Sequence, residues 1–121
     1  MAVWLTNALQ STLIVCFYPE RWVDDGHTEA AAEVKHHAQA RVGSLLDQVD
    51  AELARHGGPW LLGDSYSALD PYLFTLCRWT RGFSNSPARE RHNIGPYLQR
   101  MLERTAVQRV LATEGLQVPF V

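Results

Sequence analysis

Residues 61–79 read LLGDSYSALDPYLFTLCRW, and this stretch decides the fold. Ser67 and Asp70 lie three residues apart, just before an apolar run, which is the spacing of a helix-capping box. In such a box the Ser67 hydroxyl accepts a hydrogen bond from the Asp70 amide, and the Asp70 carboxylate accepts one from the Ser67 amide. Pro71 follows in the first turn, where its missing N–H costs little. The stretch therefore predicts the start of a buried helix near residue 68.

The same stretch has a second interpretation, because Gly63-Asp64-Ser65 resembles the opening of a hydrolase nucleophile motif. A serine becomes a strong nucleophile only beside a positioned base. The Asp-x-x-His pair that such enzymes carry downstream is found here only upstream, as Asp24 and His27. The α/β sheet that would present the serine is also missing from the pattern, so the cap is the preferred interpretation.

Working outward from this stretch, apolar residues recur every three to four positions in five segments, which predicts a helix in each. The first segment ends before Pro19, because the residue preceding a proline disfavours helical backbone angles. The second is long and is ended by Gly57-Gly58-Pro59. No segment alternates as a strand would. The chain is therefore predicted to be all-α, a bundle of about five helices in a single domain over residues 1–121. The helices are expected at residues 2–17, 28–56, 68–82, 95–104 and 106–114.

Composition and charge fit a globular domain rather than a membrane or nucleic-acid-binding protein. Of the 121 residues 46% are hydrophobic, and the formal net charge is −2. The second half is locally basic through seven arginines, which suits either a solvated helix face or an anion site. A nucleic-acid-binding domain normally shows a larger basic excess, and no apolar run is long enough to cross a bilayer. We therefore expect neither nucleic acid nor membrane as a partner.

Cysteines and histidines give no sign of a metal or catalytic centre. Cys16 and Cys77 sit far apart in apolar helical segments, which is typical of core cysteines in a reducing cytoplasm. His36 and His37 are adjacent, so on a helix they point about 100° apart and cannot chelate one metal together. We expect no catalytic residue, no metal and no bound cofactor in this chain.

Aromatic side chains mark two places that suit a ligand. Phe17, Tyr18 and Trp22 cluster where the first helix ends, and Trp79 closes the third helix. Aromatic spacing of this kind often reflects core packing. Aromatic residues at helix ends beside polar loops also make good walls for an apolar pocket. Both interpretations remain open on the residues alone.

Taken together, the segments are similar to the C-terminal helical domain of cytosolic glutathione S-transferases, nearest to the bacterial beta class. The resemblance covers essentially the whole chain. Its most specific part is the Gly-Asp followed by a Ser-x-x-Asp box and an apolar helix. The stretches that carry it are PWLLGDSYSALDPYLFTLCRW at residues 59–79, PYLQRMLERTAVQRVLATEGL at 96–116 and WLTNALQSTLIVCFYPERW at 4–22.

The resemblance implies a two-domain, cytoplasmic parent of which this chain is the helical half. In the family a thioredoxin-like domain, missing here, binds the co-substrate glutathione and supplies the catalytic residue. The helical half contributes the pocket for a small apolar electrophile and helps to build a homodimer. Ser67 and Asp70 match the folding cap of the family, and Trp79 matches an aromatic residue of the electrophile pocket. Phe17, Tyr18 and Trp22 lie where the first helix approaches that pocket.

One departure from the family and two alternatives follow from the same residues. Beta-class enzymes often carry a polar His-Lys pair in the first helix, where this chain has Leu13-Ile14-Val15-Cys16. Assistance to glutathione chemistry from that side is therefore not expected. The alternatives to the transferase interpretation are a non-catalytic helical module for protein–protein interaction and a binder of apolar ligands.

Overall fold

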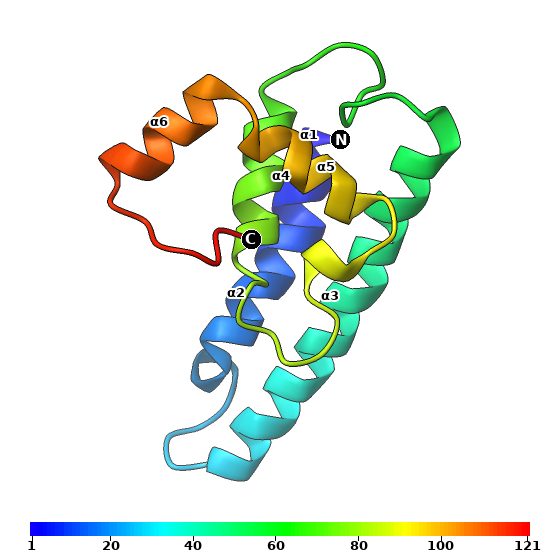
Figure 1. Cartoon of the computed structure of the whole chain (residues 1–121). Helices are drawn as coiled ribbons and strands as arrows, with labels where there is room; N and C mark the ends of the chain where they lie inside the picture. The colour runs from blue at the N-terminus through cyan, green and yellow to red at the C-terminus, as the bar shows by residue number, and fades with distance from the viewer. The chain divides into compact units, whose positions relative to one another are not determined.

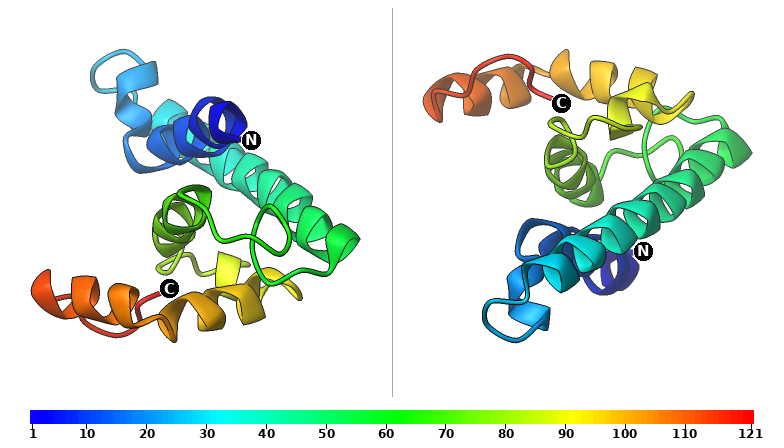
Figure 2. Two further views of the ribbon diagram at one scale, coloured as in Figure 1. Left: turned by 90° about the horizontal axis from the view of Figure 1, so that it is seen from above. Right: turned by 90° about the horizontal axis from the view of Figure 1, so that it is seen from below.

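The computed structural model describes all residues from 1 to 121, and its backbone contacts divide them into two compact units. The first unit is Met1–Leu46 and the second is Asp47–Val121. Both are helical, as the ribbon drawings show (Figures 1 and 2). Neither contains a β-strand, since the one bridge-like pairing, between Trp60 and Gly63, is isolated. The predicted all-α class with about five helices is confirmed.

The first helix of unit one is continuous but not uniform. It consists of α1 (Ala2–Trp4), the π-helical segment η1 (Leu5–Gln10) and α2 (Ser11–Phe17). Within it the Ser11 amide reaches back five residues to the Thr6 carbonyl, which is the wide hydrogen bond of a π-turn. Sequence periodicity predicted a single helix over residues 2–17, and the structure confirms its ends while adding this wider turn. Its buried stripe is formed by Leu5, Leu9, Leu13 and Cys16.

A short connection turns the chain back along the first helix. The 3₁₀ segment η2 (Pro19–Trp22) is followed by a loop, and α3 (Thr28–His56) then begins. The first half of α3 runs antiparallel to the first helix, so unit one is a helical hairpin (Figure 1). The predicted bounds of the long helix, residues 28–56, are those observed. The remaining residues of α3 belong to unit two.

The end of α3 is fixed by glycine geometry and by one histidine. Gly57 has φ +67°, a left-handed conformation suited to glycine, and its amide donates to the Leu53 carbonyl. The Gly58 amide donates to His56 Nδ1, 2.9 Å away. Because Nδ1 accepts this bond, the ring proton lies on Nε2, which is 3.0 Å from the Leu61 carbonyl and donates to it. The His56 ring therefore ties both sides of the turn.

Unit two packs short helices around a buried core. They are α4 (Leu69–Arg78), the 3₁₀ segment η3 (Ala88–Glu90), α5 (Ile94–Leu102) and α6 (Thr105–Thr113). The sequence predicted that the third helix continues to residue 82, but α4 ends at Arg78. The buried Thr80 hydroxyl donates to the Cys77 carbonyl and accepts from the Ala88 amide, which turns the chain instead. The core of this unit includes Leu61, Leu73, Leu76, Cys77, Ile94, Tyr97, Leu98 and Met101.

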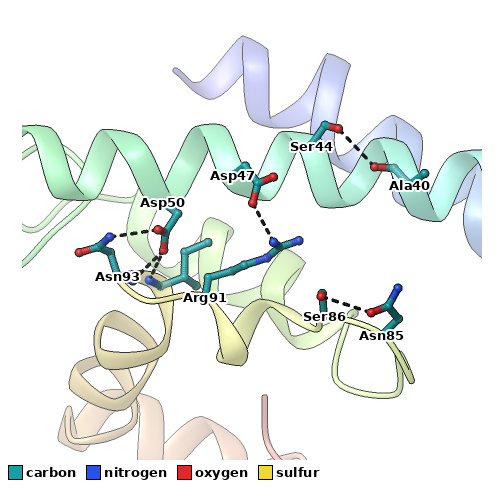
Figure 3. A network of polar contacts seen from close by, with 9 residues as sticks. Ala40, Ser44, Asp47, Asp50, Asn85, Ser86, Arg91 and Asn93 are labelled. Carbon is teal, nitrogen blue, oxygen red and sulfur yellow. Dashed lines mark hydrogen bonds and ion pairs between the residues drawn. The ribbon is translucent and has the colours of Figure 1, made fainter.

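Asp50 caps the beginning of α5 from 43 residues away (Figure 3). Its Oδ1 accepts from the amides of Asn93 and Ile94 at 2.7 and 2.9 Å, and Oδ2 accepts from the Asn93 side chain at 3.0 Å. Partial burial raises the pKa of Asp50, but these hydrogen bonds and nearby His92 together lower it by more than burial raises it. The pKa therefore lies below its ordinary value. The ionised carboxylate therefore stabilises the folded state.

The Asp50→Asn variant is expected to lose about 1 kcal/mol of unfolding free energy at neutral pH, because the charge facing the helix terminus is removed. A depressed folded-state pKa stabilises the protein above the unfolded-state value, about 3.9, and that contribution disappears as the pH falls through the folded-state pKa. The difference between the two proteins should therefore shrink between pH 5 and pH 3. Urea unfolding at several pH values measures it. A difference that stays constant down to pH 3 would contradict the role of the Asp50 charge.

Candidate functional site

The Asp70 carboxylate is the centre of a buried polar network at the start of α4. The residue has no solvent-exposed surface. Its Oδ2 accepts from the Ser67 amide at 2.9 Å, which is the reach-back half of the predicted capping box. Its Oδ1 accepts from the Leu61 amide at 2.9 Å and from the Tyr97 hydroxyl at 2.8 Å. One carboxylate thus joins the loop, α4 and α5.

The other half of the box differs from the prediction in its donor. The Ser67 hydroxyl accepts from the Leu69 amide at 3.2 Å, whereas the Asp70 amide donates to the Ser67 carbonyl. Ala68 already has helical backbone angles, φ −60° and ψ −19°, which places Ser67 at the N-cap position and Leu69 at the second helical residue. An N-cap hydroxyl bonds either the second or the third amide, and here it bonds the second.

Tyr97 is the member of this network that sequence periodicity did not identify. It is fully buried on α5, and burial, followed by the neighbouring Asp70 charge, raises its pKa far above the ordinary range. The phenol therefore stays protonated and donates to Asp70. Its position among apolar residues of an amphipathic helix indicated only a core aromatic, since nothing local marks a partner 27 residues away.

The four aromatic residues predicted to line a pocket are divided between the units. Phe17, Tyr18 and Trp22 belong to unit one and are 47%, 46% and 52% exposed. Tyr18 carries the Arg21 guanidinium over its ring, 4.2 Å from the centroid. Trp79 belongs to unit two, where it forms the partly buried C-cap of α4. Tyr18 and Trp22 lie at the two ends of the one-turn segment η2.

A groove of about 740 Å³ runs along the hairpin of unit one. This volume falls within the range of small-molecule sites. Trp22 lines it, whereas Phe17 and Tyr18 do not. Its exposed surface is mostly apolar, and charged and polar side chains contribute the rest. The lining residues are Ser11, Thr12, Val15, Trp22, Ala30, Glu33, Val34, His37, Ala38 and Arg41.

Comparisons with known proteins agree with the helical fold. Residues 14–114 match the family model described as glutathione S-transferase, C-terminal domain. The chain belongs to this family. Glutathione S-transferase GstA of Escherichia coli O157:H7 is 38% identical over 58 residues, covering 48% of this chain and 28% of the relative. Glutathione S-transferase GST-4.5 of Xanthomonas campestris pv. campestris is 36% identical over 81 residues, covering 65% and 37%. No solved structure matches.

The chain spans about a third of the length of these curated relatives. The family match confirms the resemblance that residues 59–79 and 96–116 carry. It concerns the glutathione S-transferase C-terminal domain, within which the Ser67–Asp70 cap lies. None of the helices of this domain combines the length and the apolar character needed to span a bilayer.

The cysteines of this glutathione S-transferase C-terminal domain are structural. Cys16 and Cys77 are both buried. Burial raises the pKa of the Cys77 thiol to about 12 and also raises that of Cys16, where nearby Lys35 opposes the effect. Both thiols are therefore protonated at neutral pH, and neither is an activated nucleophile. Ser65 is exposed and forms no hydrogen bond to a histidine or aspartate, and no group of three or more acidic, His or Cys side chains is arranged to hold a metal ion.

Most arginines of the second half serve as internal ties in the same domain rather than as an anion site. Arg104 lies over the Tyr66 ring at 3.6 Å and near Trp60 at 5.3 Å, which fastens the junction of α5 and α6 to the loop after α3. Others donate to backbone carbonyls or pair with an aspartate. These are Arg78 to Phe120, Arg81 to Arg78, Arg89 to Arg81 and Val121, Arg91 to Asp47, and Arg100 to Pro59.

Proposed function

We propose that this chain is the electrophile-binding and dimer-forming half of a cytoplasmic glutathione transferase that acts in detoxification. The family match over residues 14–114 is the observation that carries the proposal. The partly exposed aromatic side chains at the ends of the first helix and of α4 support it, because such residues suit an apolar co-substrate. The partner in this proposal is a thioredoxin-like domain that holds glutathione.

The proposed reaction divides the work between the two domains. The thiolate of glutathione attacks an electrophilic carbon, a carbon–sulfur bond forms, and the leaving group departs with its bonding electrons. The chain described here holds the electrophile and orients that carbon, which makes the encounter effectively intramolecular. It does not supply the nucleophile, since both of its thiols are buried and protonated.

The isolated chain is expected to show no turnover of glutathione with a chromogenic aryl halide, whereas its fusion behind a thioredoxin-like domain of a bacterial transferase should be active. In the fusion, Trp79→Ala should raise the KM for the aryl halide several-fold and leave the KM for glutathione nearly unchanged. Light scattering after size exclusion should give a dimer of the fusion. Asp64→Ala, at an exposed loop residue, is the matched control.

Two results would contradict the proposal. Robust turnover by the isolated chain would show that the glutathione site does not depend on a separate thioredoxin-like domain. A folded, dimeric fusion without activity would favour the non-catalytic interaction module instead.

A further inference from the structure

The groove of unit one lies on a different face of the first helix from Phe17. Residues of an α-helix are about 100° apart around its axis, so Phe17 points at least about 120° away from Ser11, Thr12 and Val15. Those three residues line the groove and Phe17 does not. The groove is therefore separate from the surface on which Phe17 stands, and of the four aromatic residues assigned to the electrophile pocket two, Tyr18 and Phe17, do not line it, while Trp22 does.

Two side chains at the loop end of the groove have no partner within the protein. The Trp22 ring is half exposed, packs against no other aromatic ring and lies under no arginine or lysine. Glu33 is exposed and forms no ion pair or hydrogen bond. An open indole face and a free carboxylate that line one groove favour an organic cation as ligand, because the ring quadrupole and the negative charge attract the same group.

The distribution of charged residues along the chain also favours a cation at this end of the groove. Residues 20–33 carry five carboxylates and a single arginine, while residues 34–46 carry two basic side chains and no carboxylate. Arg21, the one cation at the acidic end, is already placed over Tyr18. Arg41 lines the far end of the groove, about 12 Å along α3 from Glu33, which exceeds the screening length of about 8 Å at physiological salt.

We propose that this groove binds an amphiphilic organic cation, with its ammonium group between Trp22 and Glu33. The apolar body of the ligand then lies along Val15, Val34 and Ala38, which form the aliphatic wall. Binding here needs neither glutathione nor the second domain, so it does not depend on the proposed transferase activity.

Three probes of one shape separate charge from apolar contact: 1-naphthylmethylammonium, 1-naphthalenemethanol and 1-naphthoate. Titration calorimetry with the full chain should give the ammonium the highest affinity, about two- to fivefold above the alcohol and further above the carboxylate. Glu33→Gln should remove this advantage and leave the affinity for the alcohol unchanged. Trp22→Leu should weaken binding of both. Raising the salt concentration should weaken the ammonium alone.

Matched variants locate the site. Ala30→Leu should fill the groove and abolish binding, because Ala30 lines it at a partly exposed position. Glu29→Gln changes an exposed carboxylate one turn earlier that does not line the groove, and Phe17→Ser changes the other helix face. Both should leave the ammonium affinity within twofold of the parent. Far-UV circular dichroism of each variant checks that the hairpin is folded.

Several outcomes would overturn the proposal. Equal or tighter binding of the carboxylate would assign the groove to anions through Arg41. Binding that survives Ala30→Leu in a folded variant, or that is lost with Phe17→Ser, would place the ligand elsewhere. Absence of binding by all three probes would show that the groove is not a site for this class of ligand.

Discussion

Asp70→Ala is expected to lower the free energy of unfolding by about 3–5 kcal/mol, enough to unfold a large fraction of a marginally stable protein. The substitution removes the carboxylate that accepts from the amides of Leu61 and Ser67 and from the hydroxyl of Tyr97, and it leaves the hydroxyl only a longer bond, of 3.3 Å, to the backbone carbonyl of residue 70. All three donors lie around the start of α4, where the groups are buried or partly buried. Replacing the carboxylate by water there costs free energy. Urea unfolding followed by far-UV circular dichroism measures the effect.

Asp64→Ala provides the control for Asp70, because Asp64 lies in the same loop but is exposed. It should change stability by no more than about 0.5 kcal/mol. Tyr97→Phe should cost about 1 kcal/mol, since it removes one donor while the carboxylate keeps its two amide donors. Combined with Asp70→Ala it should cost less than the sum of the two, because the phenol has then already lost its shorter bond, the one to the carboxylate. If Asp70→Ala were as mild as Asp64→Ala, the network would not determine stability.

Gly58→Ala is expected to be the second most damaging change, with a loss of about 1–3 kcal/mol. A Cβ at position 58 would lie 2.6 Å from both the carbonyl carbon and the carbonyl oxygen of Gly63. These are backbone atoms that cannot rotate away. They are also held in place, because the Gly63 carbonyl accepts from the Trp60 amide at 3.0 Å and the Gly63 amide donates to the Trp60 carbonyl at 3.0 Å. The added methyl group must therefore deform the turn that leads into the Asp70 network.

Gly82→Ala is the matched control for this clash. A Cβ there would meet no atom within 4 Å, and the residue does not have a positive φ. Its expected effect is neutral or a gain of about 0.4–1 kcal/mol, because alanine restricts the unfolded chain. In thermal and urea unfolding, the changes in stability of the two variants should therefore have opposite signs or differ clearly in size. Equal losses would indicate that both positions need glycine for its backbone freedom rather than for space.

Local signals predicted the parts of the fold that depend on neighbouring residues. The long helix was predicted at both ends, and the local signal for its C-terminal end was Gly57-Gly58-Pro59, where Gly57 has a positive φ. The start of α4 was predicted because its hydrogen bonds form within one turn. The Ser67 amide donates to the Asp70 carboxylate, and the Ser67 hydroxyl accepts from the Leu69 amide. The end of α4 was missed, because the bond from the Ala88 amide to the Thr80 hydroxyl depends on a residue in another segment.

Long-range polar contacts could not be obtained from the pattern. The sequence gives no indication that Tyr97 bonds Asp70, or that Asp50 caps α5 across 43 residues. The groove was likewise absent from the prediction, although Trp22 was selected as a pocket residue. Its walls include small and aliphatic side chains such as Val15 and Ala38, which look like ordinary apolar positions of two helices until the hairpin places them together. The grouping of Phe17, Tyr18, Trp22 and Trp79 into one electrophile pocket stays a prediction.

The π-helical turn at Leu5–Gln10 has a consequence for how this helix tolerates changes in length. Closing a turn with a five-residue step accommodates one residue more than the regular four-residue step. In a regular α-helix, side chains spaced by four advance about 40° at each step and would spiral off a common line. The wider turn absorbs that drift, so that Leu5, Leu9 and Leu13 remain in phase and buried. Removing one residue from this turn would therefore restore ordinary hydrogen bonding and leave the helix on either side in nearly the same rotation, whereas removing one residue from a regular part of the helix would rotate one side by about 100°.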